Sequence, residues 1–171
     1  MAIAWGHAFV TETSVLRAGL QDALPELART FRDPWWIIGS AAMALTGVPD
    51  IAPQDIDVLC SREDALRLQA AWMPHADLAY RPQDEARFRS TFARFTHLPM
   101  PLEVMGDLEV MTAEGWRPLQ VLDDTIVGFD AHAVRVPTFA EQQRIFTLFG
   151  RPKDLAKAAR IAAFLEGCHV A

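Results

Sequence analysis

The chain has 171 residues, of which 51% are hydrophobic and 22% are charged, a composition typical of one folded domain with its own core. Two cysteines are too few for a disulfide framework and suit a reducing compartment, so we expect a cytoplasmic protein. The net charge is −6, so the protein has no overall positive field to attract nucleic acid, which could bind only through a local basic patch. No apolar run is long enough to span a membrane, and the first ten residues do not resemble a secretion signal, so we expect no membrane partner.

The N-terminal segment, residues 1–33, is predicted to be helical. Its apolar residues recur at intervals of three and four between Val15 and Leu27, the period of an amphipathic helix. Pro25 falls inside this pattern and removes a helix hydrogen bond. The segment is therefore predicted to form one kinked helix or two helices.

The middle segment, residues 34–137, is predicted to be a sheet core. An apolar run at 35–38 predicts a central strand, and the residues after it, 40–45, are good helix formers. A second strand is expected over 55–60, followed by a helix that Ser61 caps. Further strands are expected at residues 76–80, 88–95, 102–105, 125–129 and 133–136.

The C-terminal segment, residues 138–171, is predicted to form two helices. Thr138 and Glu141 have capping-box spacing, and Gly150 suits the left-handed end of the helix that they open. Pro152 is suited to the first position of the next helix. With no linker or repeat in the sequence, we expect a single α+β domain, residues 1–171, with a mixed central sheet flanked by helices.

Three acidic residues carry the strongest chemical signal. Asp55 and Asp57 are two positions apart on a predicted strand, so they point to the same face. Glu103 stands between Leu and Val on a later strand and completes a three-carboxylate site if its face is the same. Crowded carboxylates favour a hard dication such as Mg²⁺ or Mn²⁺ between them. Before them, the Gly39-Ser40 turn offers backbone N–H groups to a phosphate.

Each of these signals alone has an ordinary structural interpretation. Two acids on one strand face are most often a solvated edge, a Gly-Ser pair is most often a tight connection, and an acid between apolar residues is most often half-exposed. The order and spacing of all three together favour a functional site.

The order of these motifs resembles that of the DNA polymerase β-like nucleotidyltransferase superfamily. The matching segments are the strand and turn Trp36–Ser40, the triplet Asp55–Asp57 and the strand Leu102–Val104. The segment Gly150–Leu155 resembles one in small bacterial members, including aminoglycoside nucleotidyltransferase-like proteins and nucleotidyltransferase toxins. One departure is that residues 52–54, Ala-Pro-Gln, replace the Thr or Arg-x-His that many relatives carry there.

The resemblance implies a Mg²⁺-dependent enzyme that transfers a nucleoside monophosphate from an NTP to an acceptor hydroxyl. Asp55, Asp57 and Glu103 would then be catalytic and metal-binding residues, and Glu103 would also act as base. The departure at residues 52–54 keeps an alternative open, a non-catalytic protein of the same fold that binds a nucleotide or a partner. The acidic chain favours a small molecule or a protein as acceptor, although a short tRNA end is possible.

Basic residues that could bind the triphosphate occur in two segments of the sequence. Lys153 lies in the family-like segment, at the start of a helix where a cation suits an anionic ligand. Among the arginines of the strand expected next to Glu103, we expect Arg89 to bind nucleotide, and Arg87 and Arg94 to be exposed. The histidines and cysteines have no ligand or nucleophile spacing.

Overall fold

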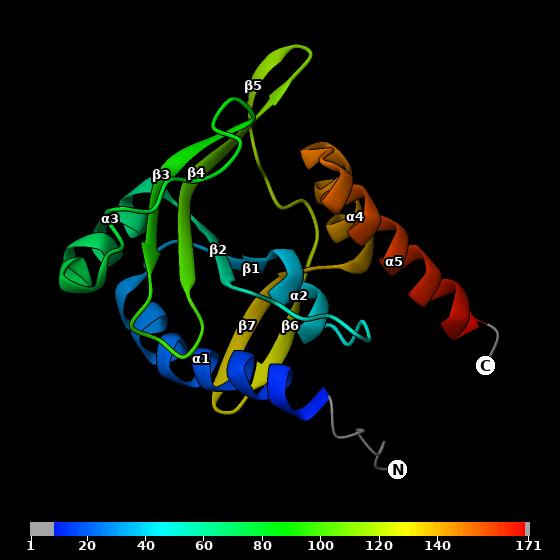
Figure 1. Ribbon diagram of the computed structural model, residues 1–171, viewed down its shortest axis with the longest axis horizontal. Helices are drawn as coiled ribbons and strands as arrows, with labels where there is room; N and C mark the ends of the chain where they lie inside the picture. The colour runs from blue at the N-terminus through cyan, green and yellow to red at the C-terminus, as the bar shows by residue number, and fades with distance from the viewer. Residues whose placement is uncertain (1–8, 170–171) are drawn as a thin grey trace.

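A five-stranded mixed sheet forms the centre of the structure (Figure 1). The computed structural model describes residues 9–169, with side chains from 14 to 168. The strands are β1 (Trp36–Ile38), β2 (Ile56–Cys60), β3 (Phe88–Phe95), β4 (Leu102–Thr112) and β5 (Gly115–Pro118). Their order is β1-β2-β4-β3, and β5 pairs with the last part of β4. β2 and β4 are parallel, while the other pairs are antiparallel, so the sheet is mixed as expected.

Helices surround this sheet, and a separate two-stranded hairpin lies against β1 (Figure 1). The helices of the described chain are α1 (Phe9–Thr30), α2 (Gly39–Leu45), α3 (Arg62–Ala71), α4 (Phe139–Phe149) and α5 (Pro152–His169), with a 3₁₀ turn at Met73–His75. The hairpin consists of β6 (Asp124–Phe129) and β7 (His132–Pro137). Within the described residues, no helix combines the length and the apolar character that crossing a membrane requires.

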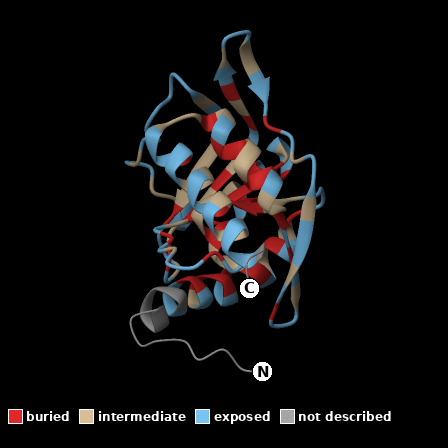
Figure 2. Cartoon of the chain, turned by 90° about the vertical axis from the view of Figure 1, so that its right-hand side faces the viewer, coloured by how far each residue is buried: buried red, intermediate tan, exposed pale blue. Residues whose placement is uncertain are grey.

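The two faces of the sheet pack against different helices. Ile56 and Val58 of β2 belong to a core cluster with α1 and α3, whereas Leu59 belongs to a second cluster with α4 and α5. Because strand side chains alternate between faces, Asp57 shares the face of Leu59. Buried residues, red in Figure 2, concentrate on the strands and on the inner sides of the helices. The acidic position of β2 therefore faces the C-terminal helices.

The N-terminal helix runs through Pro25 without a break, which decides between the two predicted forms. Leu20, Leu24 and Leu27 of this helix are almost completely buried. Burying each such side chain contributes about 1.5–3 kcal/mol. A proline in a helix interior costs about 3 kcal/mol, so the buried stripe outweighs it.

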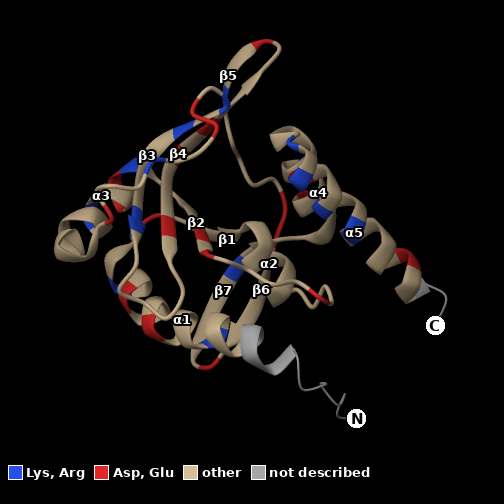
Figure 3. Cartoon of the chain, in the orientation of Figure 1, with Lys and Arg blue, Asp and Glu red and all other residues tan. Residues whose placement is uncertain are grey.

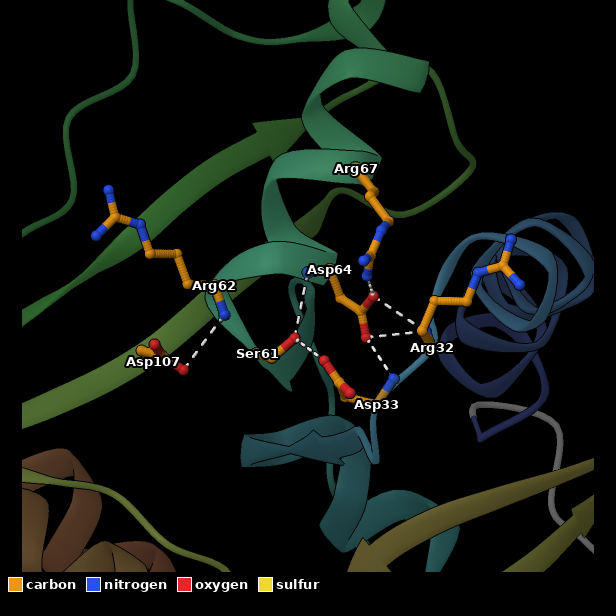
Figure 4. Close-up of polar contacts among 7 residues, drawn as sticks. All are labelled: Arg32, Asp33, Ser61, Arg62, Asp64, Arg67 and Asp107. Atoms are coloured by element: carbon orange, nitrogen blue, oxygen red, sulfur yellow. Dashed lines mark hydrogen bonds and ion pairs between the residues drawn. The ribbon is translucent and has the colours of Figure 1, made fainter.

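A buried carboxylate fixes the approach to β1 (Figure 4). Asp64 in the first turn of α3 is fully buried and accepts hydrogen bonds from the backbone N–H groups of Arg32 (3.0 Å) and Asp33 (2.9 Å). Arg67 supplies the balancing charge at 2.5 Å, and Ser61 caps the helix by accepting from the Asp64 N–H, as predicted. This cluster ties the chain before β1 to the helix that follows β2.

Both C-terminal helices begin as predicted and α4 ends as predicted, whereas α5 continues through Gly167 to His169. Thr138 accepts a hydrogen bond from the Glu141 N–H, Gly150 ends α4 with a φ of 69°, and Pro152 is the first residue of α5. Arg87 is exposed, as expected, and its guanidinium donates to the carbonyl oxygen of Phe149 at 2.7 Å, which holds the end of α4.

Three sequence expectations about strands were wrong. Residues 76–80 form a loop with one bridge, Ala76 to Phe95, because the Asp77 side chain accepts the N–H groups of Ala79 and Tyr80 in a local turn. The first strand, β1, lies at the end of the sheet and is not central. β4 extends well beyond Met105, and its hairpin with β5 was not predicted.

Candidate functional site

Three charged residues form a row across neighbouring strands. Asp57 of β2 stands opposite Glu103 of β4 in the parallel register, and Glu103 stands opposite Arg94 of β3 in the antiparallel register. Acidic positions on β2 and β4 and basic positions on β3 are visible near the centre of Figure 3. The condition that the sequence left open, a shared face for Asp57 and Glu103, is therefore met, and Asp55 directly precedes β2.

Asp57 is the most electrostatically perturbed member of this row. Its pKa is raised to about 8, first by burial and then by the nearby carboxylates of Asp55 and Glu103, against smaller opposite effects of Lys157 and Arg151. The carboxylate is therefore short of positive charge in the protein alone.

Gly39 makes room for the Asp57 carboxylate. Its φ is +69°, and a Cβ at this position would come closer to Asp57 Oδ2 than van der Waals contact allows. The residue therefore has two reasons to be glycine, its backbone conformation and the approach of an acidic side chain.

Arg94 pairs with the other two carboxylates. Its guanidinium forms an ion pair with Glu103 and lies 3.6 Å from Asp55 Oδ2. The Arg94 Cζ atom also lies 4.5 Å from the ring centroid of Tyr80. The side chain is only 18% exposed, so the expectation of an exposed Arg94 was wrong. Burial, followed by the charge of Asp55, raises the pKa of Glu103.

These residues line a cavity of about 790 Å³. The sheet contributes Asp57, Glu103 and Arg94, the loop after α3 contributes Tyr80, and α5 contributes Lys153, with further lining residues from β1 and α4. A cavity of this size accommodates a molecule as large as a nucleotide.

The only two lysines of the sequence, Lys153 and Lys157, both line this cavity. They lie four residues apart on α5, which places them on one helix face. Lys157 lies over the ring of Phe146 at 5.4 Å, and burial lowers its pKa, although the charge of Asp57 opposes this. Sequence reasoning selected Lys153 and missed Lys157, which the helical spacing from Lys153 would have indicated.

The other predicted nucleotide-binding residues lie at different distances from this centre. Gly39 lines the cavity, whereas the adjacent Ser40, half-buried in the first turn of α2, is not among the lining residues. Arg89 lines the cavity, but its guanidinium donates to Glu109 at 2.5 and 3.1 Å and lies 4.5 Å from the ring centroid of Trp116. The charge of Arg89 is thus already matched by a carboxylate.

The carboxylates suit a divalent cation by their chemistry. Oxygen donors alone favour Mg²⁺ or Mn²⁺ over zinc, and a dication would offset the crowded charge around Asp57. Among the described residues, no three His, Cys, Asp or Glu side chains are arranged to hold a metal ion. Arg94 instead contacts Glu103 and lies near Asp55.

Replacing Gly39 with alanine tests the close approach of Asp57. Gly47→Ala is the matched control, because Gly47 also has a positive φ (+89°) but no atom within 4 Å of the added Cβ. The backbone conformation alone costs about 1–2 kcal/mol in each variant. We expect urea unfolding to show a larger loss for Gly39→Ala, and Mn²⁺ titration to show weakened binding only there. Equal losses with unchanged Mn²⁺ binding would contradict this role of Gly39.

Comparison with solved structures identifies the fold. A candidate nucleotidyltransferase from Thermotoga maritima aligns with 86% of this chain and 91% of its own, at 20% identity and a TM-score of 0.65. The antibiotic-resistance factor ANT(2'')-Ia aligns with 95% of this chain and 86% of its own at 14% identity (TM-score 0.48). An antigenic nucleotidyltransferase-like protein from Paracoccidioides brasiliensis covers 90% of this chain and 75% of its own at 13% identity (TM-score 0.42).

No protein-family model matches the sequence, and no curated protein matches it. The structural similarity to the Thermotoga maritima protein extends over most of both chains, and it agrees with the mixed sheet and flanking helices described above. The chain therefore has the nucleotidyltransferase fold that the resemblance of its sequence motifs implied.

Proposed function

We propose that the protein is a nucleotidyltransferase that uses Mg²⁺, or Mn²⁺ in its place, to transfer a nucleoside monophosphate from an NTP to an acceptor hydroxyl. The observation that carries the proposal is the arrangement of Asp57 and Glu103, in register on parallel strands, in a cavity that also contains both lysines of the chain. Carboxylates for a metal ion and cations for phosphate are the two requirements of phosphoryl-type transfer.

In this proposal the acidic residues bind the metal ion and the basic residues bind the phosphates. Asp55, Asp57 and Glu103 hold the divalent cation, which supplies charge neutralisation for the triphosphate when it is bound. Lys153 and Lys157 balance phosphate charge from the α5 side, and the Gly39-Ser40 turn, of which Gly39 lines the same cavity, is a further phosphate contact. Arg89 is a weaker candidate, because Glu109 already neutralises it.

Glu103 has the second role of base. The acceptor oxygen forms a bond to the α-phosphorus, the bond from that phosphorus to the bridging oxygen breaks, and pyrophosphate leaves. The acceptor proton goes to the Glu103 carboxylate, which lies in the same cavity as the other carboxylates and the lysines. A small molecule or a protein is the favoured acceptor, and a short tRNA end is the other candidate.

Chemical labelling of the two lysines tests the phosphate-binding part of the proposal. Because Lys153 and Lys157 are the only lysines, reductive methylation followed by peptide mass spectrometry follows each of them separately. We expect MgATP to slow methylation of both, and Lys157→Ala to weaken MgATP binding. Unchanged labelling of both lysines in saturating MgATP would place the triphosphate elsewhere.

A transfer assay tests the proposed reaction itself. The purified protein is incubated with each of four α-³²P-labelled NTPs, Mg²⁺ and separate pools of metabolites, tRNA and lysate proteins. We expect label to reach a component of one pool in the wild type and none in Asp57→Asn. MgNTP binding without transfer to any pool would instead favour the non-catalytic alternative.

A further inference from the structure

Arg94 occupies a position that the proposed reaction does not explain. Its guanidinium forms an ion pair with Glu103 and lies 3.6 Å from Asp55 Oδ2, so it contacts two of the three carboxylates that the proposed function assigns to a divalent cation. The register of β3 against β4 places Arg94 opposite Glu103, and both side chains are mostly buried, at 18% and 12% exposure. This pair is therefore built into the sheet and is not a chance surface contact.

We propose that Arg94 is the resident counter-cation of the carboxylate cluster and that a divalent cation binds only by displacing its guanidinium from Glu103 and Asp55. The inference rests on the proposed function, because it requires the same carboxylates to take the ion. Two cations compete for one set of oxygen atoms, and each satisfies carboxylates that would otherwise repel one another in a partly dehydrated site. Arg94 thus keeps Glu103 and Asp55 close together before the ion arrives.

Tyr80 gives the displaced guanidinium a second favourable contact. The Arg94 guanidinium already lies 4.5 Å from the Tyr80 ring centroid, a cation–π contact in addition to its ion pairs, and the Tyr80 hydroxyl also contacts Glu103. Tyr80 in turn stacks on Phe92 with ring centroids 5.9 Å apart and belongs to the loop that lines the cavity. A movement of Arg94 therefore changes the surroundings of the Tyr80 ring.

Divalent-cation affinity gives the first test. Mn²⁺ binding is measured by calorimetry for the wild type, Arg94→Gln, Arg94→Lys and Arg17→Gln. Arg17 is a matched control, because it too pairs with a carboxylate, Asp130, and lies 5.0 Å from an aromatic ring centroid, that of Phe129, but it does not line the cavity.

The expected result is tighter binding when the competing cation is removed. Arg94→Gln should bind Mn²⁺ roughly tenfold more tightly than the wild type, since a hydrogen-bonded charged contact no longer has to be broken. Arg94→Lys should lie between them, because a single ammonium group cannot engage two carboxylates as a guanidinium does. Arg17→Gln should match the wild type. A role of Arg94 in folding alone would leave Mn²⁺ affinity unchanged or reduce it.

Tyr80 gives a second readout that does not depend on activity. It is the only tyrosine in the sequence, so protein labelled with ring-¹³C tyrosine gives the signals of one ring. We expect Mg²⁺ to shift these signals in the wild type and in Arg17→Gln. In Arg94→Gln, saturating Mg²⁺ should shift them less than in the wild type, because no guanidinium is left to displace and only the contact of the Tyr80 hydroxyl with Glu103 still responds to the ion.

The outcomes separate this inference from the proposed function. Suppose that Mn²⁺ binding depends on Asp57 in the wild type. If folded Arg94→Gln then binds Mn²⁺ no more tightly than the wild type, or if Arg94→Lys binds it more weakly than the wild type, the role of Arg94 is overturned and the proposed function stands. If Arg94→Gln does not fold, an unchanged affinity in Arg94→Lys together with unmoved Tyr80 signals in the wild type overturns it. No Mn²⁺ binding by the wild type or any variant would overturn both proposals.

Discussion

Asp57→Asn should abolish nucleotidyl transfer and, in metal-free buffer at pH 8, make the protein more stable than the wild type. The loss of transfer follows from the loss of a carboxylate that holds the ion. The gain in stability follows from the pKa of Asp57, which burial and then Asp55 and Glu103 raise to about 8 in the folded protein.

The direction of this pH effect follows from proton binding. An unfolded aspartate has a pKa of about 4, so between about pH 4 and pH 8 the folded state binds more protons at Asp57 than the unfolded state does. The stability of the metal-free wild type therefore falls as the pH rises through this window. Asparagine has no proton to lose, so the variant escapes the fall.

Thermal unfolding at several pH values in EDTA measures the effect. At pH 8 we expect Asp57→Asn to melt at least about 3 °C above the wild type, which corresponds to about 1 kcal/mol in a domain of this size. Asp130→Asn is a control of opposite sign, because hydrogen bonding from Gln21 and the charge of Arg17 lower the pKa of Asp130. If the difference in melting temperature between the wild type and Asp57→Asn is the same at pH 8 as at pH 5, the buried-charge account is contradicted.

Glu103→Gln should retain MgNTP binding and lose most of the transfer rate. The amide keeps the shape of the side chain but cannot accept the acceptor proton, and loss of one positioned base typically costs about 10²- to 10⁴-fold. Asp57→Asn, by contrast, should lose nucleotide binding as well as turnover, because the ion that carries the triphosphate is held there in the ground state.

Single-turnover rates and nucleotide affinities for both variants separate these effects. Glu114→Gln serves as control, because Glu114 lies in the exposed β4–β5 turn and does not line the cavity. A wild-type rate in Glu103→Gln would remove Glu103 from the role of base, and Asp107 and Glu109 further along β4 would be the next acids to test.

Much of the site could be predicted because its geometry is local. The strand period predicts one face for Asp55 and Asp57, although Asp55 lies just before β2, and the side chain of Glu103 points away from those of its apolar neighbours. The helix caps at Ser61 and Thr138 were confirmed. They could be predicted because a capping hydrogen bond spans only three residues.

The contacts of Arg94 and Lys157 could not be predicted in the same way. Which arginine of β3 meets Glu103 depends on the register with β4, and a bulge between Arg89 and Thr91 shifts that register by an amount that the sequence does not reveal. Lys157 approaches Asp57 only because α5 packs against the far side of the cavity, which is a tertiary contact. Local patterns therefore selected Arg89, whose charge Glu109 matches, in place of Arg94.

Nucleotide binding tests the central claim most directly, because it does not require the acceptor to be known. Calorimetric titration of an α,β-methylene analogue of each of the four NTPs compares the wild type with Asp57→Asn, with Mg²⁺ and with EDTA. The account predicts binding of one molecule per chain for at least one analogue, lost both in EDTA and in Asp57→Asn. Binding that is equally strong in EDTA and in Asp57→Asn, or no binding of any analogue at millimolar concentration with Mg²⁺, would contradict it.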